Sequence, residues 1–313
     1  MDTTRVPVTL RARRFGRRIP LVRATRILVR IAGHPSNRQR RLTAMWRAVN
    51  WQVRSRLSAD PVEIPAYGDT VLLCYPRSNS ASNVIYFTPY YDYDEMHFLD
   101  RYLRAGDVVV DAGANIGTYS LLAASRVGPS GRVIAFEPAP VAFERLRENV
   151  ARNALEQVET HGAAVGARTD RAAMRISSDV SNTLVTVPGL VGVTTGVDIV
   201  RLDDVVSERR PALIKLDVEG FEFEALQGAV GLLAVDPAPV LLIEFIDHLL
   251  RAAGTSPQVL RTWLRDRRYE LYDYDARTNA LRAVGPSPSG NHLAIRDDGR
   301  GHAMARLSTT MPG

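Results

Sequence analysis

Residues 106–137 constrain the fold of this chain more than any other stretch. A short β-branched run ends in Asp111, a pattern that predicts a buried parallel strand. A glycine-containing turn follows, and then an Ala/Leu-rich segment over 118–127 that predicts a helix. A second predicted strand, 132–136, ends in the acidic Glu137. Strand, glycine turn, helix, strand and acid occur in this order in nucleotide-binding βαβ units, so we expect an open α/β sheet.

The spacing of the glycines in this turn separates two classes of ligand. A dinucleotide fold uses GxGxxG, which seats a pyrophosphate on the helix N-terminus. Here three residues separate Gly113 from Gly117, and Asp111 precedes both. A carboxylate in the turn repels a pyrophosphate but attracts the ammonium and sulfonium groups of S-adenosylmethionine. We therefore expect S-adenosylmethionine, with Asp111 near its methionine end and Glu137 on its ribose. An NAD-linked oxidoreductase and a purely structural βαβ unit are the alternatives.

The cofactor site is predicted to extend to the end of a later strand. Ala163 and Ala164 close the predicted strand 158–165 and are small enough to leave room for an adenine ring. The predicted cofactor-binding residues are Asp111, Gly113, Asn115, Gly117, Glu137 and Ala164.

A second informative stretch is PALIKLDVEGFEFEALQG at 211–228. It predicts a buried strand over 212–216, with Gly220 before a helix over 221–227. If the strand geometry continues, its period of two places Lys215, Asp217 and Glu219 on one face. Ligands of open α/β sheets bind at the carboxyl ends of the strands, so these side chains are the candidate catalytic residues. Lys215 is the only lysine among 40 basic residues.

An alcohol that accepts a methyl group must lose a proton, and a positioned carboxylate can take it. Asp217 is the first candidate for this general base and Glu219 the second, while Lys215 would hold the carboxylate or the acceptor oxygen. Capping of the following helix is the alternative role for both carboxylates. A further strand over 240–245 brings Glu244 to the same edge. A divalent cation held by the three carboxylates is therefore another alternative, although nothing in their spacing demands a metal.

Composition and charge bound the rest of the chain. The 313 residues allow one large domain with an appendage, and the single cysteine, Cys74, excludes an internal disulfide. No apolar run reaches the ~18 residues needed to cross a bilayer, so we expect a soluble, cytoplasmic protein. Residues 3–59 hold 15 arginines and no acidic residue, although the net charge is only +6. We expect a basic, partly disordered arm over 1–37 that makes at most weak contact with a membrane surface. Phe15 is the only aromatic residue in this arm, so no nucleic-acid partner is expected.

The regions that follow the arm are a lead-in over 38–104, a catalytic domain over 105–296 and a disordered tail over 297–313. Within the lead-in we expect an amphipathic helix whose apolar stripe packs on the body or on a second subunit, with an interfacial membrane helix as the alternative. The stripe of this helix consists of Leu42, Met45, Trp46, Val49, Val53 and Leu57.

Residues 166–200 predict a β-hairpin or loop insertion that carries the acceptor site. Further helices are expected over 94–104, 141–154 and 257–268, and strands over 70–75, 83–87, 269–274 and 291–296.

The chain resembles the FkbM family of S-adenosylmethionine-dependent methyltransferases over residues 60–296. The resemblance is carried by VVVDAGANIGTYS at 108–120, IAFEP at 134–138 and LIKLDVEGFEFEALQG at 213–228, with weaker support from 90–107 and 201–205. It implies a Rossmann-like class I methyltransferase fold with a seven-stranded, mostly parallel sheet and an antiparallel last strand. It also implies methyl transfer to a hydroxyl of a sugar, glycan or secondary metabolite.

Overall fold

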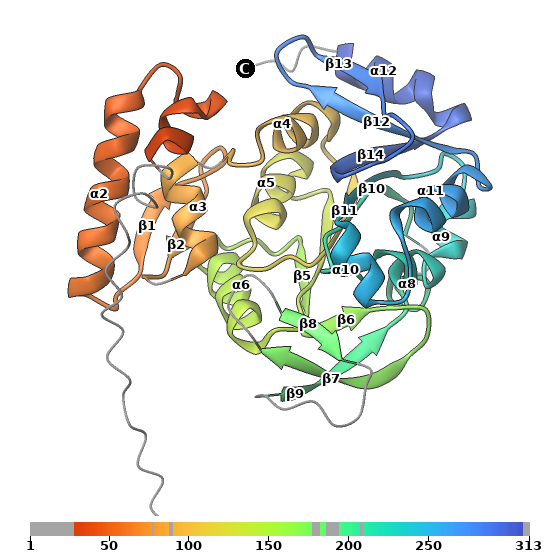
Figure 1. Ribbon diagram of the computed structural model, residues 1–313, viewed down its shortest axis with the longest axis horizontal. Helices are drawn as coiled ribbons and strands as arrows, with labels where there is room; N and C mark the ends of the chain where they lie inside the picture. Colours follow the sequence, from red (N-terminus) through yellow and green to blue (C-terminus); the bar gives the residue numbers. More distant parts are fainter. Residues whose placement is uncertain are drawn as a thin grey trace, which may run out of the picture.

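The computed structural model describes residues 28–76, 78–87, 90–176, 182–185, 194–206 and 209–308. Most of the predicted arm and the last five residues therefore lie outside the described part of the chain. The described residues form an α/β fold around one large sheet, with a smaller sheet and a helical lead-in beside it (Figure 1).

The large sheet has eight strands in the order β13–β12–β14–β11–β10–β3–β4–β5. Neighbouring strands from β11 to β5 are parallel, whereas β14 runs antiparallel to both β11 and β12. The predicted Rossmann-like sheet with its antiparallel last strand is thus confirmed, and β13 adds an eighth strand as the hairpin partner of β12. The strands are β3 (Val108–Ala112), β4 (Arg132–Phe136), β5 (Val158–His161), β10 (Pro211–Leu216), β11 (Val240–Phe245), β12 (Tyr269–Asp275), β13 (Ala280–Ala283) and β14 (Gly290–Arg296).

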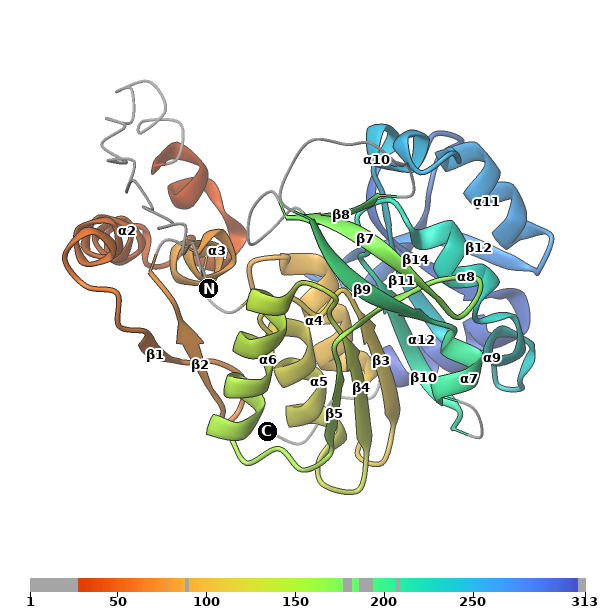
Figure 2. The same ribbon diagram turned by 90° about the horizontal axis from the view of Figure 1, so that it is seen from below.

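Both faces of the large sheet are buried, which explains why its central strands are continuous apolar runs. Val109 and Leu213 pack into one hydrophobic cluster, and their neighbours Val110 and Ile214 pack into another. Figure 2 shows the two helical layers, with α4, α5 and α6 on one face and α7 to α11 on the other. These helices are α4 (Tyr93–Tyr102), α5 (Thr118–Val127), α6 (Pro140–Arg152), α7 (Leu202–Val206), α8 (Glu222–Gln227), α9 (Val230–Ala234), α10 (Asp247–Ala252) and α11 (Pro257–Arg265).

The smaller sheet contains the insertion predicted over 166–200, together with the strand that precedes it. Its order is β6–β9–β7–β8, and β7 is antiparallel to both of its neighbours. The single strand predicted over 158–165 is in fact two strands that belong to different sheets. The break between them falls at Gly162, where an added Cβ would lie 3.1 Å from the ring of Phe143. The strands are β6 (Ala163–Val165), β7 (Asp170–Ile176), β8 (Asn182–Val185) and β9 (Thr194–Val200).

The lead-in combines helices with a two-stranded sheet. It comprises a helical segment at 28–33, η1 (Pro35–Asn37), α2 (Arg41–Leu57), β1 (Val62–Pro65), β2 (Val71–Cys74) and α3 (Asn79–Phe87). The strand predicted over 83–87 is wrong, since these residues end helix α3. Tertiary packing overrides their β propensity, because helical spacing buries Ala81, Val84 and Phe87 together. In the described residues no helix is long and apolar enough to cross a membrane.

The predicted helix over 38–57 is confirmed as α2, but it packs with another face. Its buried residues are Ala44, Ala48 and Trp51, and the Trp51 indole donates a hydrogen bond of 3.0 Å to Ser82 Oγ on α3. Small side chains let α3 approach closely. The predicted apolar stripe, apart from the half-buried Met45, is exposed to solvent. The expectation that it packs on the body is therefore wrong.

The predicted disordered tail is also wrong for residues 297–308. They form η2 (Asp297–Gly299) and α12 (Arg300–Ser308), and α12 buries Ala303 and Leu307 against the core. The Arg306 guanidinium donates bonds of 2.5 and 3.0 Å to the two carboxylate oxygens of Asp107, just before β3. The helix has only two buried apolar residues, and its partners lie far away in the sequence, so the sequence pattern was too weak to indicate order. Residues 309–313 lie outside the described range.

Candidate active site

The glycine turn after β3 brings two strands of the sheet into close contact. Gly113 has φ +78°, and a Cβ added there would lie 1.8 Å from the main-chain oxygen of Asp217. Gly117 has φ +93°, and its missing Cβ makes room for Leu146 of α6. Only glycine fits both positions, which explains their spacing of four.

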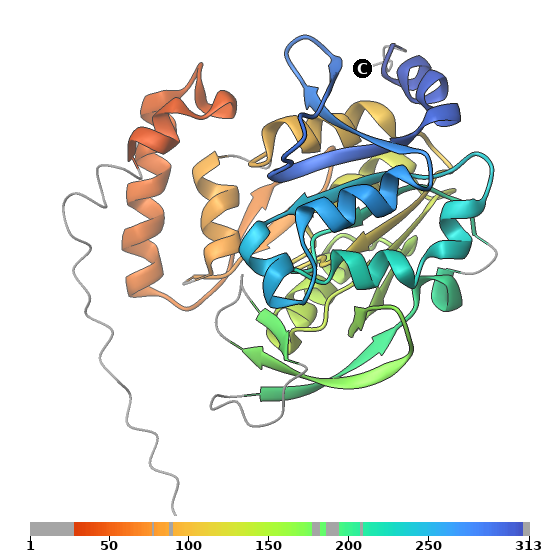
Figure 3. The same ribbon diagram turned by 45° about the vertical axis from the view of Figure 1, so that its right-hand side comes forward.

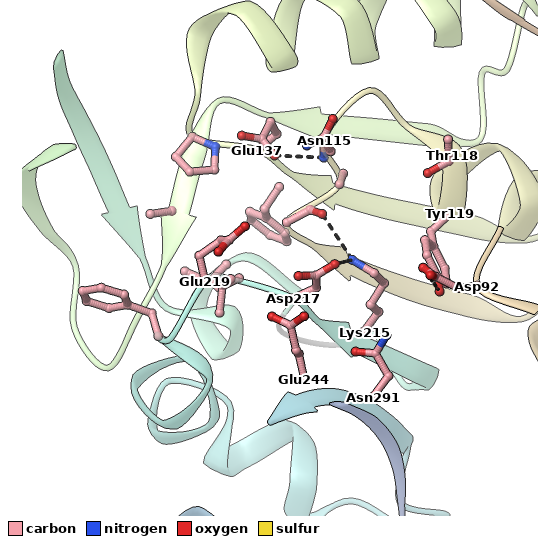
Figure 4. A pocket seen from close by; sticks show the side chains of 18 of the residues that line it. Asp92, Asn115, Thr118, Tyr119, Glu137, Lys215, Asp217, Glu219, Glu244 and Asn291 are labelled. Atoms are coloured by element: carbon pink, nitrogen blue, oxygen red, sulfur yellow. Dashed lines mark hydrogen bonds and ion pairs between the residues drawn. The ribbon is translucent and has the colours of Figure 1, made fainter. Parts of the chain in front are cut away.

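A cavity of about 270 Å³ opens where β3, β4, β10 and β11 end (Figure 4). It lies at the predicted carboxyl edge of the sheet. The structure brings seven of the nine predicted site residues to its wall. They are Gly113, Asn115, Glu137, Ala164, Lys215, Asp217 and Glu219. The other two, Asp111 and Gly117, do not line it.

Glu137 is held in one orientation by the main chain. Its two carboxylate oxygens accept hydrogen bonds of 2.8 Å from the N–H groups of Asn115 and Ala139. Burial raises the pKa of Glu137 to about 7, although these two N–H groups act in the opposite direction. Each oxygen keeps a lone pair for a ligand hydroxyl, as a ribose would require.

The wall beside Glu137 is apolar. It is formed by Phe136 at the end of β4, Pro138 after this strand, Ala163 and Ala164 on β6, and Phe221 before α8. The two alanines are the residues predicted from the sequence to leave room for an adenine ring. An apolar slot therefore lies next to a carboxylate that can accept hydrogen bonds from hydroxyl groups.

Lys215 is the centre of the polar floor. Its ammonium lies 3.3 Å from Asp217 Oδ2 and 3.4 Å from Asp111 Oδ1, and it donates a bond of 3.2 Å to the Gly113 carbonyl. It also stands 4.9 Å from the ring centroid of Tyr119. Burial alone would lower the pKa of Lys215, but the charges of Asp217 and Asp111 outweigh it and raise this pKa. The lysine is therefore a fixed cation.

Asp111 lies behind Lys215 instead of on the cavity wall. Its carboxylate is almost fully buried, and its Oδ2 atom accepts a bond of 2.6 Å from Ser120 Oγ of α5. Its observed contacts are with Lys215 and α5. Asp217 differs, because its side chain is 41% exposed and faces the cavity.

Two further acids surround Asp217. Burial and the charges of Asp217 and Glu137 raise the pKa of Glu219 to about 7. Burial, together with the Asp217, Glu222 and Glu219 charges, raises the pKa of Glu244 to about 8. The three carboxylates proposed as a cation site in the sequence form no metal-binding group among the residues that the structure describes.

Glu222 organises the loop that carries these acids, a role not recognised from the sequence. It is buried, and its Oε1 atom accepts bonds of 3.1 and 3.2 Å from the N–H groups of Val218 and Gly220. Glu219 between them has φ +55°, so its side chain leaves the strand geometry assumed in the sequence argument. The position of Glu222 in the first turn of the predicted helix was the sequence signal for this capping role.

Sequence reasoning also missed a group contributed by the segment before α4. Tyr91 and Asp92 line the cavity together with Tyr119, whose hydroxyl donates a bond of 3.0 Å to Asp92. Burial raises the pKa of Asp92 to about 6, and this hydrogen bond opposes the shift. The polar cluster YYDYDE at 90–95 was the signal available. Asn83 of α3 and Asn291 of β14 complete this side.

Comparison with known proteins identifies the chemistry of this site. Residues 111–271, just over half of the chain, match the family described as the methyltransferase FkbM domain. The chain belongs to this family. Residues 111–271 therefore form a methyltransferase domain, and the alternative of an NAD-linked oxidoreductase does not match this family.

Individual FkbM relatives match over part of their length. The chain is 35% identical over 159 residues to the 31-O-demethyl-FK506 methyltransferase FkbM of Streptomyces tacrolimicus, covering 40% of this chain and 60% of that protein. It is 27% identical over 150 residues to the hexuronic acid methyltransferase AglP of Haloferax volcanii, covering 45% and 57%. The chain thus spans about three-fifths of the length of these relatives. A solved Streptococcus mutans methyltransferase in complex with SAH is similar with a TM-score of 0.38 and 12% identity, covering 64% of this chain and 94% of that one.

The cavity fits the cofactor of this family. Glu137 has two oriented oxygens that can accept hydrogen bonds from ribose hydroxyls, and the slot at Ala163 and Ala164 has room for a flat ring. On the other side of the cavity, Gly113 has no side chain, so a ligand can approach the main chain there. Acidic side chains also outnumber the single cation of the floor, which suits a positively charged sulfonium.

Proposed function

We propose that this FkbM-family enzyme methylates a hydroxyl group of a sugar, glycan or secondary metabolite, with Asp217 as the general base. The observation that carries the proposal is the arrangement around Lys215. Of the two carboxylates that pair with its ammonium, Asp111 is closed off, while Asp217 is open to the cavity. Asp111 thus only pairs with the lysine, whereas Asp217 can also contact an acceptor.

The cofactor is proposed to lie along β3 and β4. Glu137 would bind the ribose, Asn115 and Gly113 would border the middle of the site, and Ala164 would contact the adenine. Asp111 would act through Lys215, which makes it a positioning residue. When bound, S-adenosylmethionine supplies an electrophilic methyl group. The chain's own contribution is to exclude water and to orient the acceptor.

Asp217 would accept the proton of the acceptor hydroxyl as the new bond to its oxygen forms. The proton moves from the hydroxyl oxygen to a carboxylate oxygen of Asp217, a contribution of about 10²- to 10⁴-fold in rate. Lys215 holds the other carboxylate oxygen at 3.3 Å, which fixes the orientation of the base. Glu219 is the second candidate, since its pKa of about 7 suits proton exchange near neutral pH.

A neighbouring cavity supports a polar acceptor. About 500 Å³ in volume, it shares Asn291 with the cofactor cavity and is lined by aromatic, acidic and arginine side chains. Hydroxyl-rich molecules suit such a lining. Carboxylates accept hydrogen bonds from their hydroxyl groups, and aromatic rings pack against their apolar edges. Among the relatives, AglP is named as a hexuronic acid methyltransferase and FkbM as a methyltransferase of demethyl-FK506. These names agree with an oxygenated acceptor. The lining residues include Tyr93, Tyr272, Tyr274, Asp273, Glu95 and Arg282.

The test is the variant Asp217→Asn. We expect it to bind S-adenosylhomocysteine with unchanged affinity by calorimetry, and to transfer labelled methyl to a panel of sugars and macrolide alcohols at least about 100-fold more slowly. Asp69→Asn, in the exposed turn before β2, is the control and should be fully active. Unchanged turnover in Asp217→Asn would refute the assignment. Loss of S-adenosylhomocysteine binding would move Asp217 into the cofactor site.

A further inference from the structure

Helix α2 carries an exposed apolar face that the catalytic site does not use. Five large apolar side chains on it are half or more exposed. They are Leu42 at 82%, Trp46 at 66%, Val49 at 56%, Val53 at 50% and Leu57 at 82%. A continuous exposed patch of this kind marks a binding surface, because isolated apolar residues are ordinary but an aligned row is not.

These five residues form one line along the helix. With about 100° of rotation per residue, they fall within an arc of about 80° that runs the length of α2. The buried residues Ala44, Ala48 and Trp51 lie on the opposite side and pack toward α3. Figures 1 and 3 show α2 at the outer edge of the molecule, with α3 between it and the body. The line therefore points away from the protein.

The charged side chains in the stretch around the line, residues 28–59, are all arginines. Exposed arginines lie before the helix, in its first turn and in its last turns, and the described stretch 28–59 contains no Asp or Glu. The exposed arginines of this stretch are Arg30, Arg38, Arg40, Arg41, Arg54 and Arg56. A surface of this composition is complementary to a densely anionic partner that also has an apolar interior.

We propose that α2 binds an anionic membrane surface, lying in the plane of the interface with the aliphatic residues of its apolar line among the acyl chains. Phospholipid headgroups would pair with the flanking arginines, and Trp46 would sit at the level of the headgroups, where tryptophan is enriched. The site is independent of the cofactor cavity and would make the enzyme a peripheral membrane protein.

A second copy of the chain fits this surface less well. A two-fold contact places the same patch on both sides of the interface, so the arginines of one α2 would face those of the other. No acid within α2 could neutralise them. Phospholipid headgroups supply the missing negative charge.

The experiment uses the full chain and vesicles of phosphatidylcholine with 30% phosphatidylglycerol, compared with phosphatidylcholine alone. We expect sedimentation with the anionic vesicles, weakened at least tenfold by raising the salt from about 50 to about 500 mM. The double variant Val49→Glu and Val53→Glu should bind at least tenfold more weakly. The control, Val230→Glu and Val259→Glu, changes two valines of similar exposure on α9 and α11 and should bind as the unchanged protein does.

Fluorescence gives a second readout. Brominated lipids should quench the emission of the unchanged protein, and most of this quenching should disappear in Trp46→Phe. Vesicle binding unaffected by the two glutamates would overturn the proposal in favour of adhesion through charge alone. Concentration-dependent dimers that the same two glutamates dissolve would overturn it in favour of a second copy. Absence of binding to the anionic vesicles at low salt would also overturn it.

Discussion

The buried carboxylate of Glu137 should make cofactor-product binding depend on pH. Its pKa is raised from 4.5 to about 7, mainly by burial. Because one pKa unit corresponds to about 1.4 kcal/mol, the folded protein disfavours the ionised form by about 3 kcal/mol relative to the unfolded chain. Ribose hydroxyls donate to the ionised form, so a ligand must supply part of this energy.

The direction of the effect differs between stability and binding. A raised carboxyl pKa contributes stability that is fully present below pH 4.5 and is lost as the pH rises through about 7. Affinity for S-adenosylhomocysteine should change in the opposite sense. Below pH 7 it should fall about tenfold for each pH unit, because the protein must first lose the proton from Glu137.

The assay is calorimetric titration with S-adenosylhomocysteine between pH 5.5 and 8.5, together with urea unfolding of the ligand-free protein. Glu137→Gln should bind more weakly at pH 8 and lose most of the slope in affinity between pH 5.5 and 7. The control is Glu95→Gln, which removes a half-buried acid with a pKa of about 7 from the neighbouring cavity and should keep the slope. A flat affinity profile in the unchanged protein would refute the role given to Glu137.

Two further predictions concern the main chain around the site. Gly113→Ala places a methyl group 1.8 Å from a main-chain oxygen at φ +78°, so urea unfolding should show a loss of about 3 kcal/mol or more, whereas Gly285→Ala, with open space around it, should stay within about 1 kcal/mol. Glu222→Ala leaves two N–H groups of the catalytic loop without an acceptor and should lower the unfolding free energy by about 1–3 kcal/mol and slow methyl transfer. Glu224→Ala, in the same helical turn, is its control, and equal losses in both variants would contradict the capping role of Glu222.

The strands and turns of the cofactor half could be predicted because their signals are local. The apolar run before Asp111 and the glycine turn after it can be recognised from neighbouring residues alone, and the same holds for the strand that ends before Asp217. The errors fell where distant segments compete. Residues 83–87 have β propensity but join a helix that packs on α2. The tail from 297 packs two apolar residues into the core and pairs with Asp107, about 200 positions away.

The sequence by itself determined the βαβ plan, the cofactor class and the candidate acids, since strand period and turn chemistry are properties of short segments. Only the tertiary structure decided what each acid does. Asp111 and Asp217 carry the same side chain and flank the same lysine, yet packing of α5 closes over one and leaves the other open to the cavity. It likewise decided which face of α2 is buried. Burial depends on what lies opposite a residue in space, and that is information no single segment contains.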